Sequence, residues 1–365
     1  GRNITHQQKE LNEKELIDFK NRFDIPITDK EAVDAPFFKP DKDSEEIFYL
    51  NNCRKKLGGF LPERKIKYKK INLPKLELFS ELLNGYEKRE LSTTMAFVRL
   101  LTIITKEKEI GNFVVPIIPD EARTFGIDPL FRQIGIYSHT GQLYDPVDSK
   151  QFLFYKESKN GQILEEGISE AGAMCSFIAS GMSYANHSLI TIPFYIFYSM
   201  FGFQRIWDFI WAACDMRVRG FLIGGTAGRT TLNGEGLQHQ DGHSLLAASV
   251  TPNIKAYDLA YSYEIAVVIH RGLIEMYEEN RDVIYYITLE NENYQHPKIP
   301  KGIENDIING MYKVSSSKKP LVRLIGSGPL LRETIEAAKL LKEDWNINPG
   351  VWCVTSFSEL RKNAE

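Results

Sequence analysis

The chain has little of what marks several protein classes at first sight. Its 45 lysines and arginines are balanced by 48 aspartates and glutamates, so a net charge of −3 offers no basic surplus for nucleic acid. Its longest apolar runs, such as residues 189–203, are interrupted by proline and polar residues and are unsuited to crossing a bilayer. We recognise no signal peptide. We therefore expect neither a nucleic-acid partner nor a membrane span.

Cysteine is also scarce. The four cysteines, Cys53, Cys175, Cys214 and Cys353, lie far apart and form no CxxC pair. This spacing argues against a disulfide framework or a zinc knuckle and favours reduced, buried thiols. We expect a cytoplasmic protein.

The residues that are present have the composition of a globular protein, with 43% hydrophobic and 25% charged residues. A length of 365 residues suits two domains and an additional segment. Residues 1–70 are polar and helical in pattern, with a capping box at Asn12 before Leu16 and a helix cap at Ser44. We interpret residues 1–70 as the end of a preceding domain and a linker.

From about residue 90 the pattern alternates between apolar strands and helices. The predicted strands are 114–118, 152–155, 189–194, 221–223, 254–257 and 284–288. The predicted helices are one that Ser92 caps, followed by 171–185, 198–217 and 263–280. Continuously apolar strands that alternate with helices predict an α/β domain with a mostly parallel sheet.

A polar, proline-containing stretch over residues 290–300 separates a second α/β unit. There the strand 321–325 leads through the GSG turn at 326–328 into a helix over 331–341, and a strand follows at 351–354. Strand, GSG and helix resemble a phosphate cradle. The simpler interpretation is a glycine turn common in α/β folds, because two glycines fall short of a dinucleotide fingerprint.

Ligands of a parallel α/β sheet gather at the carboxyl ends of its strands, and several such ends carry unusual residues. Asp120 and Glu121 follow the first strand, with Arg123 two positions on, and an ion pair that fixes the loop would explain them. Glu170 opens a helix otherwise built from small and apolar residues. By itself it is a first-turn acid stabilised by the helix dipole. The alternative is a carboxylate held ready to share a proton.

Two further strand ends carry aromatic residues and histidines. The aromatic residues of 194–203 suit either core packing or a wall for a flat heteroaromatic ring. His239 and His243 have the spacing of a helical zinc pair, but Gly242 between them disfavours a helix and no third ligand follows. A histidine in a glycine-rich loop over a pocket suits proton transfer better.

Six runs, taken in order, resemble one family. They are PDEARTFG, LFRQIGIYS, EGISEAGA, IPFYIFYSMFGFQRI, RGFLIGGTAGRTTLNGEGLQHQDGHS and VTSFSEL. Over nearly its whole length the chain resembles homodimeric bacterial pyruvate dehydrogenases, the thiamine-diphosphate-dependent decarboxylating component of the pyruvate dehydrogenase complex. The resemblance implies a transketolase-type pyrimidine-binding domain over residues 71–299 and part of a transketolase-like C-terminal domain over 300–365.

The resemblance also implies roles for the residues at the strand ends. Glu170 matches the glutamate that shares a proton with the aminopyrimidine ring of the cofactor, and Phe201 matches the aromatic residue stacked on that ring. Tyr198 lies close by. Asp120 and Glu121 match acids near the reacting carbon.

Two histidines complete the implied site. His239 matches an active-site histidine near the substrate. His6 resembles the histidine of a mobile loop that closes over the cofactor and assists reductive acetylation of the lipoyl group; the alternative is an exposed terminal histidine.

One departure from the family pattern concerns the charged end of the cofactor. The family binds the diphosphate and its magnesium ion through a preceding domain with a GDG motif, and no GDG occurs here. The resemblance therefore implies that the diphosphate and Mg²⁺ ligands lie outside this chain, which we expect to be a fragment with weak cofactor affinity and no activity alone. In the intact homodimer, pyruvate is decarboxylated and the acetyl group passes to lipoamide on dihydrolipoyl acetyltransferase.

Three alternatives remain at this point. A related 2-oxo acid dehydrogenase or transketolase would differ in its substrate. A non-catalytic interaction module of the same fold would not need Glu170. A metalloprotein using His239 and His243 would carry stoichiometric metal.

Overall fold

A computed structural model describes residues 10–59, 68–119, 122–123, 125–147, 155–228, 236–315 and 319–365. The chain divides into two compact units, Gly1–Lys65 and Ile66–Glu365. The described residues contain no helix long and apolar enough to cross a membrane. None of the four cysteines forms a disulfide, and Cys214 and Cys353 are buried.

The described part of the first unit consists of three helices with little core of their own. They are α1 (Glu13–Arg22), α2 (Asp29–Val33) and α3 (Glu45–Lys56). Asn12 forms the predicted capping box with Glu15, and Ser44 accepts the predicted cap bond from Ile47 N, so both predictions are confirmed. Among residues 10–59 only Ala32 is buried, which means that this unit gains little stability from apolar burial.

The second unit is built on a six-stranded parallel sheet of order β5-β2-β6-β7-β9-β8. Its strands are β2 (Val114–Ile118), β5 (Leu164–Glu165), β6 (Ile192–Tyr198), β7 (Gly220–Gly225), β8 (Ile254–Asp258) and β9 (Ile284–Thr288). Every residue of β7 and β9 is buried, because a parallel sheet is covered by helices on both faces. The predicted α/β class with a mostly parallel sheet is confirmed.

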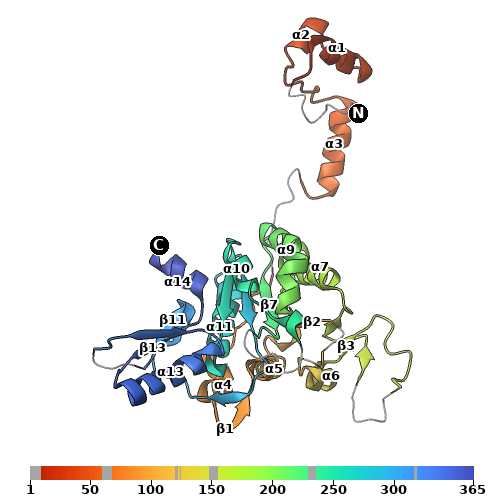
Figure 1. The fold of residues 1–365 in the computed structure, drawn as a ribbon. Coiled ribbons are helices and arrows are strands. Elements are labelled where there is room, and N and C mark those ends of the chain that lie inside the picture. The colour runs from red at the N-terminus through yellow and green to blue at the C-terminus, as the bar shows by residue number, and fades with distance from the viewer. Residues whose placement is uncertain are drawn as a thin grey trace. The chain divides into compact units, whose positions relative to one another are not determined.

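Alternate residues of each strand pack into two separate apolar clusters. Phe194 and Ile196 of β6 join a cluster with α5 and α11, whereas Tyr195 and Phe197 join one with α7, α9 and α10. Figure 1 shows α7, α9 and α10 on one side of the sheet and α4, α5 and α6 on the other. The helices and helical turns of this part are η1 (Leu76–Phe79), α4 (Ser80–Asn84), α5 (Thr93–Ile104), η2 (Gly111–Phe113), α6 (Asp128–Ile134), α7 (Glu170–Gly181), α8 (Ser183–Asn186), α9 (Ser199–Asp215), η3 (Leu237–His239), α10 (Ser244–Ser249), α11 (Ser262–Leu273) and η4 (Ile274–Glu278).

Several predicted elements differ in their bounds. The predicted strand 152–155 falls largely outside the described residues, and its last residue, Tyr155, is not in a strand. The predicted helix 171–185 is divided at Met182 into α7 and α8. The predicted helix 263–280 ends as the π-helical turn η4. Apolar periodicity does not reveal such interruptions, because both halves keep the same face buried.

The C-terminal part forms a second, three-stranded sheet of order β11-β13-β12. β13 pairs antiparallel with β11 and parallel with β12. Two small sheets, β1–β10 and β3–β4, lie elsewhere in the unit. The remaining elements are β1 (Tyr86–Leu91), β3 (Ile136–Tyr137), β4 (Glu157–Ser158), β10 (Tyr294–His296), α12 (Glu304–Ile308), β11 (Met311–Ser315), β12 (Arg323–Gly326), α13 (Leu330–Trp345), β13 (Gly350–Val354) and α14 (Phe357–Ala364).

A buried carboxylate joins the two sheets of the second unit. Glu264, in the first turn of α11, is fully buried, and its Oε2 accepts hydrogen bonds from Ala260 N (2.6 Å) and Tyr261 N (3.2 Å). Its Oε1 accepts from the Tyr312 hydroxyl of β11 (2.5 Å) and the Cys353 thiol of β13 (3.5 Å). Burial raises the pKa of Glu264 to about 7, although these donors act in the opposite direction.

This shift predicts a pH-dependent stability. The unfolded chain releases the Glu264 proton near pH 4.5, whereas the folded chain keeps it up to about pH 7. The folded state therefore holds the extra proton, and stability falls as the pH rises through this window, by on the order of 3 kcal/mol. In urea unfolding, the free energy of unfolding of wild type should fall by that amount, relative to that of Glu264→Gln, as the pH rises from 4.5 to 8. The exposed Glu333→Gln variant is the control, and a parallel pH profile for Glu264→Gln and wild type would contradict the shift.

Candidate active site at the carboxyl ends of the strands

Glu170 is the first residue of α7, directly after the loop that follows β5. The capping of this helix is performed by Ser169, whose Oγ accepts from Gly172 N at 3.2 Å. The backbone oxygen of Glu170 accepts a hydrogen bond from the Tyr195 hydroxyl at 3.1 Å. Its carboxylate therefore does not cap the helix and remains available for contacts at the carboxyl edge of the sheet.

Arg205 of α9 holds the Glu170 carboxylate. Its Nη1 donates to Oε1 of Glu170, and its guanidinium lies over the Phe201 ring at 4.2 Å from the centroid. Glu170 Oε2 accepts no hydrogen bond from a residue that the structure describes, and the side chain is 19% exposed. One carboxylate oxygen is thus fixed by a cation while the other keeps its capacity to accept a proton or a hydrogen bond.

The shape of α9 places these side chains. Arg205 immediately precedes Ile206, whose non-helical φ of −128° and ψ of 17° mark a kink. In the same turn, a Cβ on Gly202 would overlap the ring of Phe197 on β6. Glycine therefore lets the start of α9 lie directly on the sheet, which brings Phe201 and Arg205 to its carboxyl edge.

A group of aromatic rings lies beside the carboxylate. The Tyr198 ring contacts those of His239, Phe125 and Phe201, at centroid distances of 4.7, 5.0 and 5.9 Å. The rings of Phe201 and His239 are 5.4 Å apart. These tilted and edge-on arrangements are the preferred ones for aromatic pairs. Together they form an aromatic surface next to an acceptor.

The segment that carries His239 is held at its far end by Asp241. This buried carboxylate accepts from the backbone N–H groups of His243 and Ser244, both at 3.0 Å, and from the Ser244 hydroxyl. These bonds fix the start of α10, which is separated from η3 by residues 240–243. His243 itself is exposed. No group of three metal-ligating side chains occurs among the residues that the structure describes.

The Tyr195 hydroxyl is a neutral hydrogen-bond donor to the backbone of Glu170. Burial, together with the nearby negative charges of Glu170 and Glu166, raises the pKa of its hydroxyl. The phenol therefore stays protonated and continues to donate to the Glu170 backbone oxygen.

Four of the predicted site residues are brought together. Glu170 is connected through Arg205 to Phe201, which contacts Tyr198 and His239. The other three predicted residues, His6, Asp120 and Glu121, lie outside the described residues.

Sequence reasoning assigned no role to Arg205. Its position four residues after Phe201 on one helix was the available signal, because residues i and i+4 lie on the same face.

The GSG turn after β12 does not have the surroundings of a phosphate cradle. The Ser327 hydroxyl donates to the Asp258 carboxylate at 2.9 Å, and a Cβ on Gly328 would lie 2.8 Å from Asp258 Oδ1. A negative charge of the protein itself already occupies the turn. The structure thus favours the simpler interpretation of an ordinary glycine turn.

Solved structures place this fold in the transketolase-like class. The transketolase of Campylobacter jejuni aligns over 96% of this chain and 49% of its own, with a TM-score of 0.63 and 16% identity. That of Leishmania mexicana aligns over 78% of this chain and 37% of its own, with a TM-score of 0.61 and 15% identity. At this identity the similarity shows the fold.

The sequence comparisons define the family more narrowly. The model "Pyruvate dehydrogenase E1 component middle domain" matches residues 71–297, and "Transketolase-like TK C-terminal domain" matches residues 310–365. The chain belongs to the pyruvate dehydrogenase E1 component family. E1 components of Pseudomonas aeruginosa and Escherichia coli K12 are 55% and 50% identical over 100% of this chain and 42% of their own lengths. That of Mycobacterium tuberculosis is 45% identical over 100% of this chain and 40% of its own. The chain thus spans about two fifths of the length of these relatives.

Because the Arg205 side chain is exposed, we expect the ion pair between Arg205 and Glu170 to contribute little to the stability of the fold. The Arg205 side chain is 49% exposed, so Arg205→Met should lower the free energy of unfolding by no more than about 1 kcal/mol. Urea unfolding would measure this, with Arg99→Met, which removes the exposed pair to Glu81, as the matched control. A loss several times that of the control would show that the pair serves the fold.

Proposed function

We propose that this chain provides the pyrimidine-binding part of a thiamine-diphosphate-dependent pyruvate dehydrogenase E1 component. The observation that carries the proposal is the half-satisfied carboxylate of Glu170 beside the aromatic surface of Tyr198, Phe201 and His239. The 45–55% identity to E1 components supports the choice of pyruvate as substrate and lipoamide as acetyl acceptor.

The residues present fit the aminopyrimidine ring of this cofactor. A flat heteroaromatic ring can stack on Phe201, and its nitrogen atoms can exchange a proton with the oxygen of Glu170 that Arg205 leaves unoccupied. When bound, thiamine diphosphate supplies an electron sink for the decarboxylation of a 2-oxo acid.

The side chains then have distinct tasks. Glu170 holds a proton at the pyrimidine nitrogen, and Arg205 orients the carboxylate by its bond to Oε1. Tyr198 and Phe201 position the ring. His239 is half-buried against both aromatic residues, and in this proposal it transfers a proton near the substrate. Two acids near the reacting carbon, Asp120 and Glu121, complete the proposed site. The loop histidine of the proposal is His6.

The remaining parts of the proposed assembly follow from the family. Residues 71–299 form the pyrimidine-binding domain and residues 300–365 part of the C-terminal domain, after a linker that ends at about residue 70. The diphosphate and Mg²⁺ are bound by residues outside this chain, in a cytoplasmic homodimer that delivers acetyl groups to dihydrolipoyl acetyltransferase.

Substitution of Glu170 tests the proposal. In a protein that carries these 365 residues within the full length of the relatives, Glu170→Gln should reduce pyruvate turnover by about 10²–10⁴-fold, because proton transfer is lost while shape is kept. Steady-state assays with saturating thiamine diphosphate and Mg²⁺ measure kcat, and longer 2-oxo acids and ketose phosphates test the substrate choice.

Glu166→Gln is the matched control, since Glu166 lies four residues earlier, in the loop before α7, and accepts a hydrogen bond from the Ser176 hydroxyl at 2.5 Å. It should retain most of the activity. Unchanged turnover in Glu170→Gln would refute the proposed role, and a preference for ketose phosphates would favour a transketolase.

A further inference from the structure

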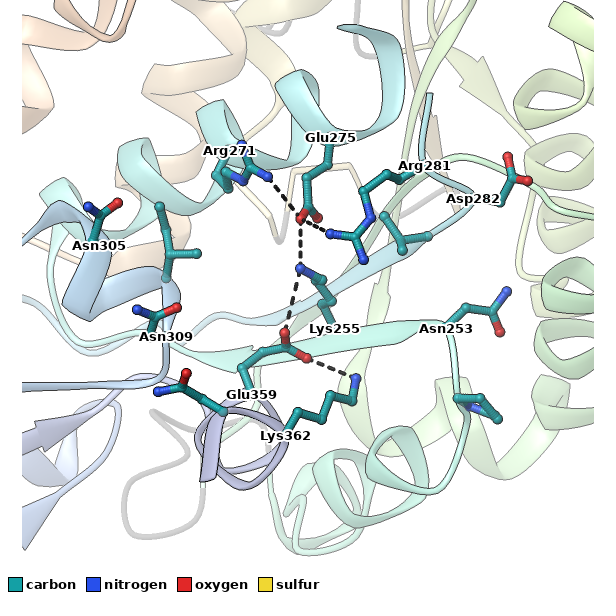
Figure 2. A pocket seen from close by; sticks show the side chains of 14 residues that line it. Asn253, Lys255, Arg271, Glu275, Arg281, Asp282, Asn305, Asn309, Glu359 and Lys362 are labelled. Atoms are coloured by element: carbon teal, nitrogen blue, oxygen red, sulfur yellow. Dashed lines mark hydrogen bonds and ion pairs between the residues drawn. The ribbon is translucent and has the colours of Figure 1, made fainter. Parts of the chain in front are cut away.

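A polar cavity lies at the opposite edge of the sheet from Glu170. This polar cavity of about 820 Å³ is lined at the amino ends of β8 and β9 by Asn253, Lys255 and residues 281–283. Its other walls come from α11, η4, α12 and α14, so it lies between elements of the six-stranded-sheet part and the C-terminal part (Figure 2). It cannot be part of the candidate active site, which lies at the carboxyl ends.

Positive charge predominates in this cavity. Four cationic side chains and three carboxylates line it: Lys255, Arg271, Arg281 and Lys362, against Glu275, Asp282 and Glu359. Two of these groups are engaged by residues outside the lining. Asp282 accepts from Arg219 at 2.9 Å, and Arg271 donates to both oxygens of Glu279. The inner wall then consists of three cations and two carboxylates.

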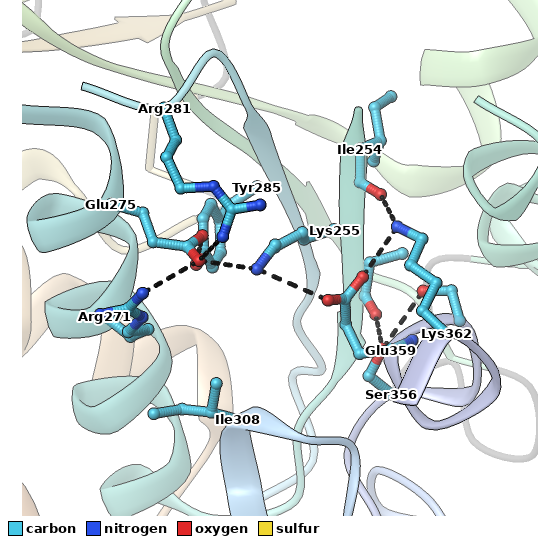
Figure 3. Close-up of polar contacts among 12 residues, drawn as sticks. Ile254, Lys255, Arg271, Glu275, Arg281, Tyr285, Ile308, Ser356, Glu359 and Lys362 are labelled. Carbon is cyan, nitrogen blue, oxygen red and sulfur yellow. Dashed lines mark hydrogen bonds and ion pairs between the residues drawn. The ribbon is translucent and has the colours of Figure 1, made fainter. Parts of the chain in front are cut away.

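Glu275 fixes the positions of the cations. It lies in the π-helical turn η4, its side chain is 2% exposed, and its Oε1 accepts from Lys255 (2.9 Å), Arg281 (3.0 Å) and Arg271 (3.2 Å) (Figure 3). Its Oε2 accepts from the Tyr285 hydroxyl at 2.6 Å. The carboxylate is saturated by donors, and π-helical turns frequently occur at functional sites.

Two of the cations keep donors for a ligand. Arg281 uses only Nη1 for Glu275, its Nε and Nη2 meet no acceptor among the described residues, and its side chain is 55% exposed. Lys362 donates to Ile254 O (3.2 Å) and Glu359 Oε1 (2.9 Å) and is 42% exposed. Lys255 lies between them, bonded to Glu275 and 3.5 Å from Glu359. Exposed amides of Asn305 and Asn309 line the same cavity.

We propose that this cavity binds the phosphate group of a small phosphate monoester, with Arg281 and Lys362 as its ligands and Lys255 as the charge behind them. A guanidinium with free Nε and Nη2 matches the geometry of two phosphate oxygens. The cavity is larger than a phosphate ion, and its amides suit a polar organic remainder. Because Arg281 follows η4 and Lys362 belongs to α14, the ligand ties the six-stranded-sheet part to the C-terminal part.

The test is calorimetric titration of the full 365-residue chain with inorganic phosphate and with glycerol 3-phosphate at low salt. Both should bind, the ester more tightly, and both should raise the melting temperature, since a ligand of the folded state stabilises it. Arg281→Gln combined with Lys362→Gln should weaken binding by about tenfold or more, the effect of losing charged hydrogen bonds.

Arg361→Gln is the matched control, because Arg361 adjoins Lys362 on α14, is 74% exposed and does not line the cavity. It removes one positive charge from the same helix without changing the cavity lining, and it should bind phosphate as wild type does. Both substituted cavity residues are substantially exposed, so the double variant should keep the wild-type melting temperature without ligand.

Absence of binding to the wild-type chain would overturn the proposal, as would equal binding by the double variant and the control. No cofactor is present in the titration, and a Glu170→Gln chain should bind phosphate unchanged. The result is therefore independent of the proposed decarboxylase function.

Discussion

The burial of the six-stranded parallel sheet on both faces is the constraint on which the other features depend. Strands β7 and β9 have no exposed residue, and β6 is buried up to its last position, Tyr198. Polar chemistry cannot lie along such strands, because an unpaired polar group there would lose its hydration without compensation. It is confined to the two edges of the sheet. Glu170 and the aromatic surface lie at the carboxyl edge, and the cationic cavity around Glu275 lies at the amino edge.

Carboxylates at these edges differ in how completely they are satisfied. Glu264 and Glu275 each accept four hydrogen bonds and hold neighbouring elements together. Such saturation leaves no capacity for a ligand and offsets part of the cost of burying an acid, although the pKa of Glu264 stays raised. Glu170 has one partner, Arg205, on one oxygen. Its other oxygen keeps the acceptor capacity that Glu264 and Glu275 lack, and the proposed ligand contact uses that capacity.

The sequence predicted what depends on local patterns. The caps at Asn12, Ser44 and Ser92 and the strands β2 and β9 were found because each has its signal within a few residues. The family resemblance, not a local pattern, predicted that four residues share one site, and the fold brings them together: Glu170, Phe201, Tyr198 and His239. The role of Arg205 depends on the kink at Ile206 and on the close approach of Gly202 to Phe197. The cationic cavity depends on residues from five separate elements, β8, α11, η4, α12 and α14. Contacts between distant segments leave no periodic signal in the chain.

Glu170 could be a first-turn acid that the helix dipole stabilises, or a carboxylate held for contact with a ligand. A helix dipole favours an acid at this position, but that effect requires no partner and no particular orientation of the carboxylate. Here Ser169 already caps α7, so the carboxylate accepts no backbone N–H of its own helix among the bonds observed. Instead it meets a guanidinium that also covers Phe201, on a helix that glycine allows to approach the sheet. The Arg205 bond, the Arg205–Phe201 contact and the close approach of Gly202 to Phe197 together determine the surroundings of the Glu170 side chain. A dipole effect accounts for none of these three contacts. The proposed binding and protonation of a flat heteroaromatic ring rests on this arrangement.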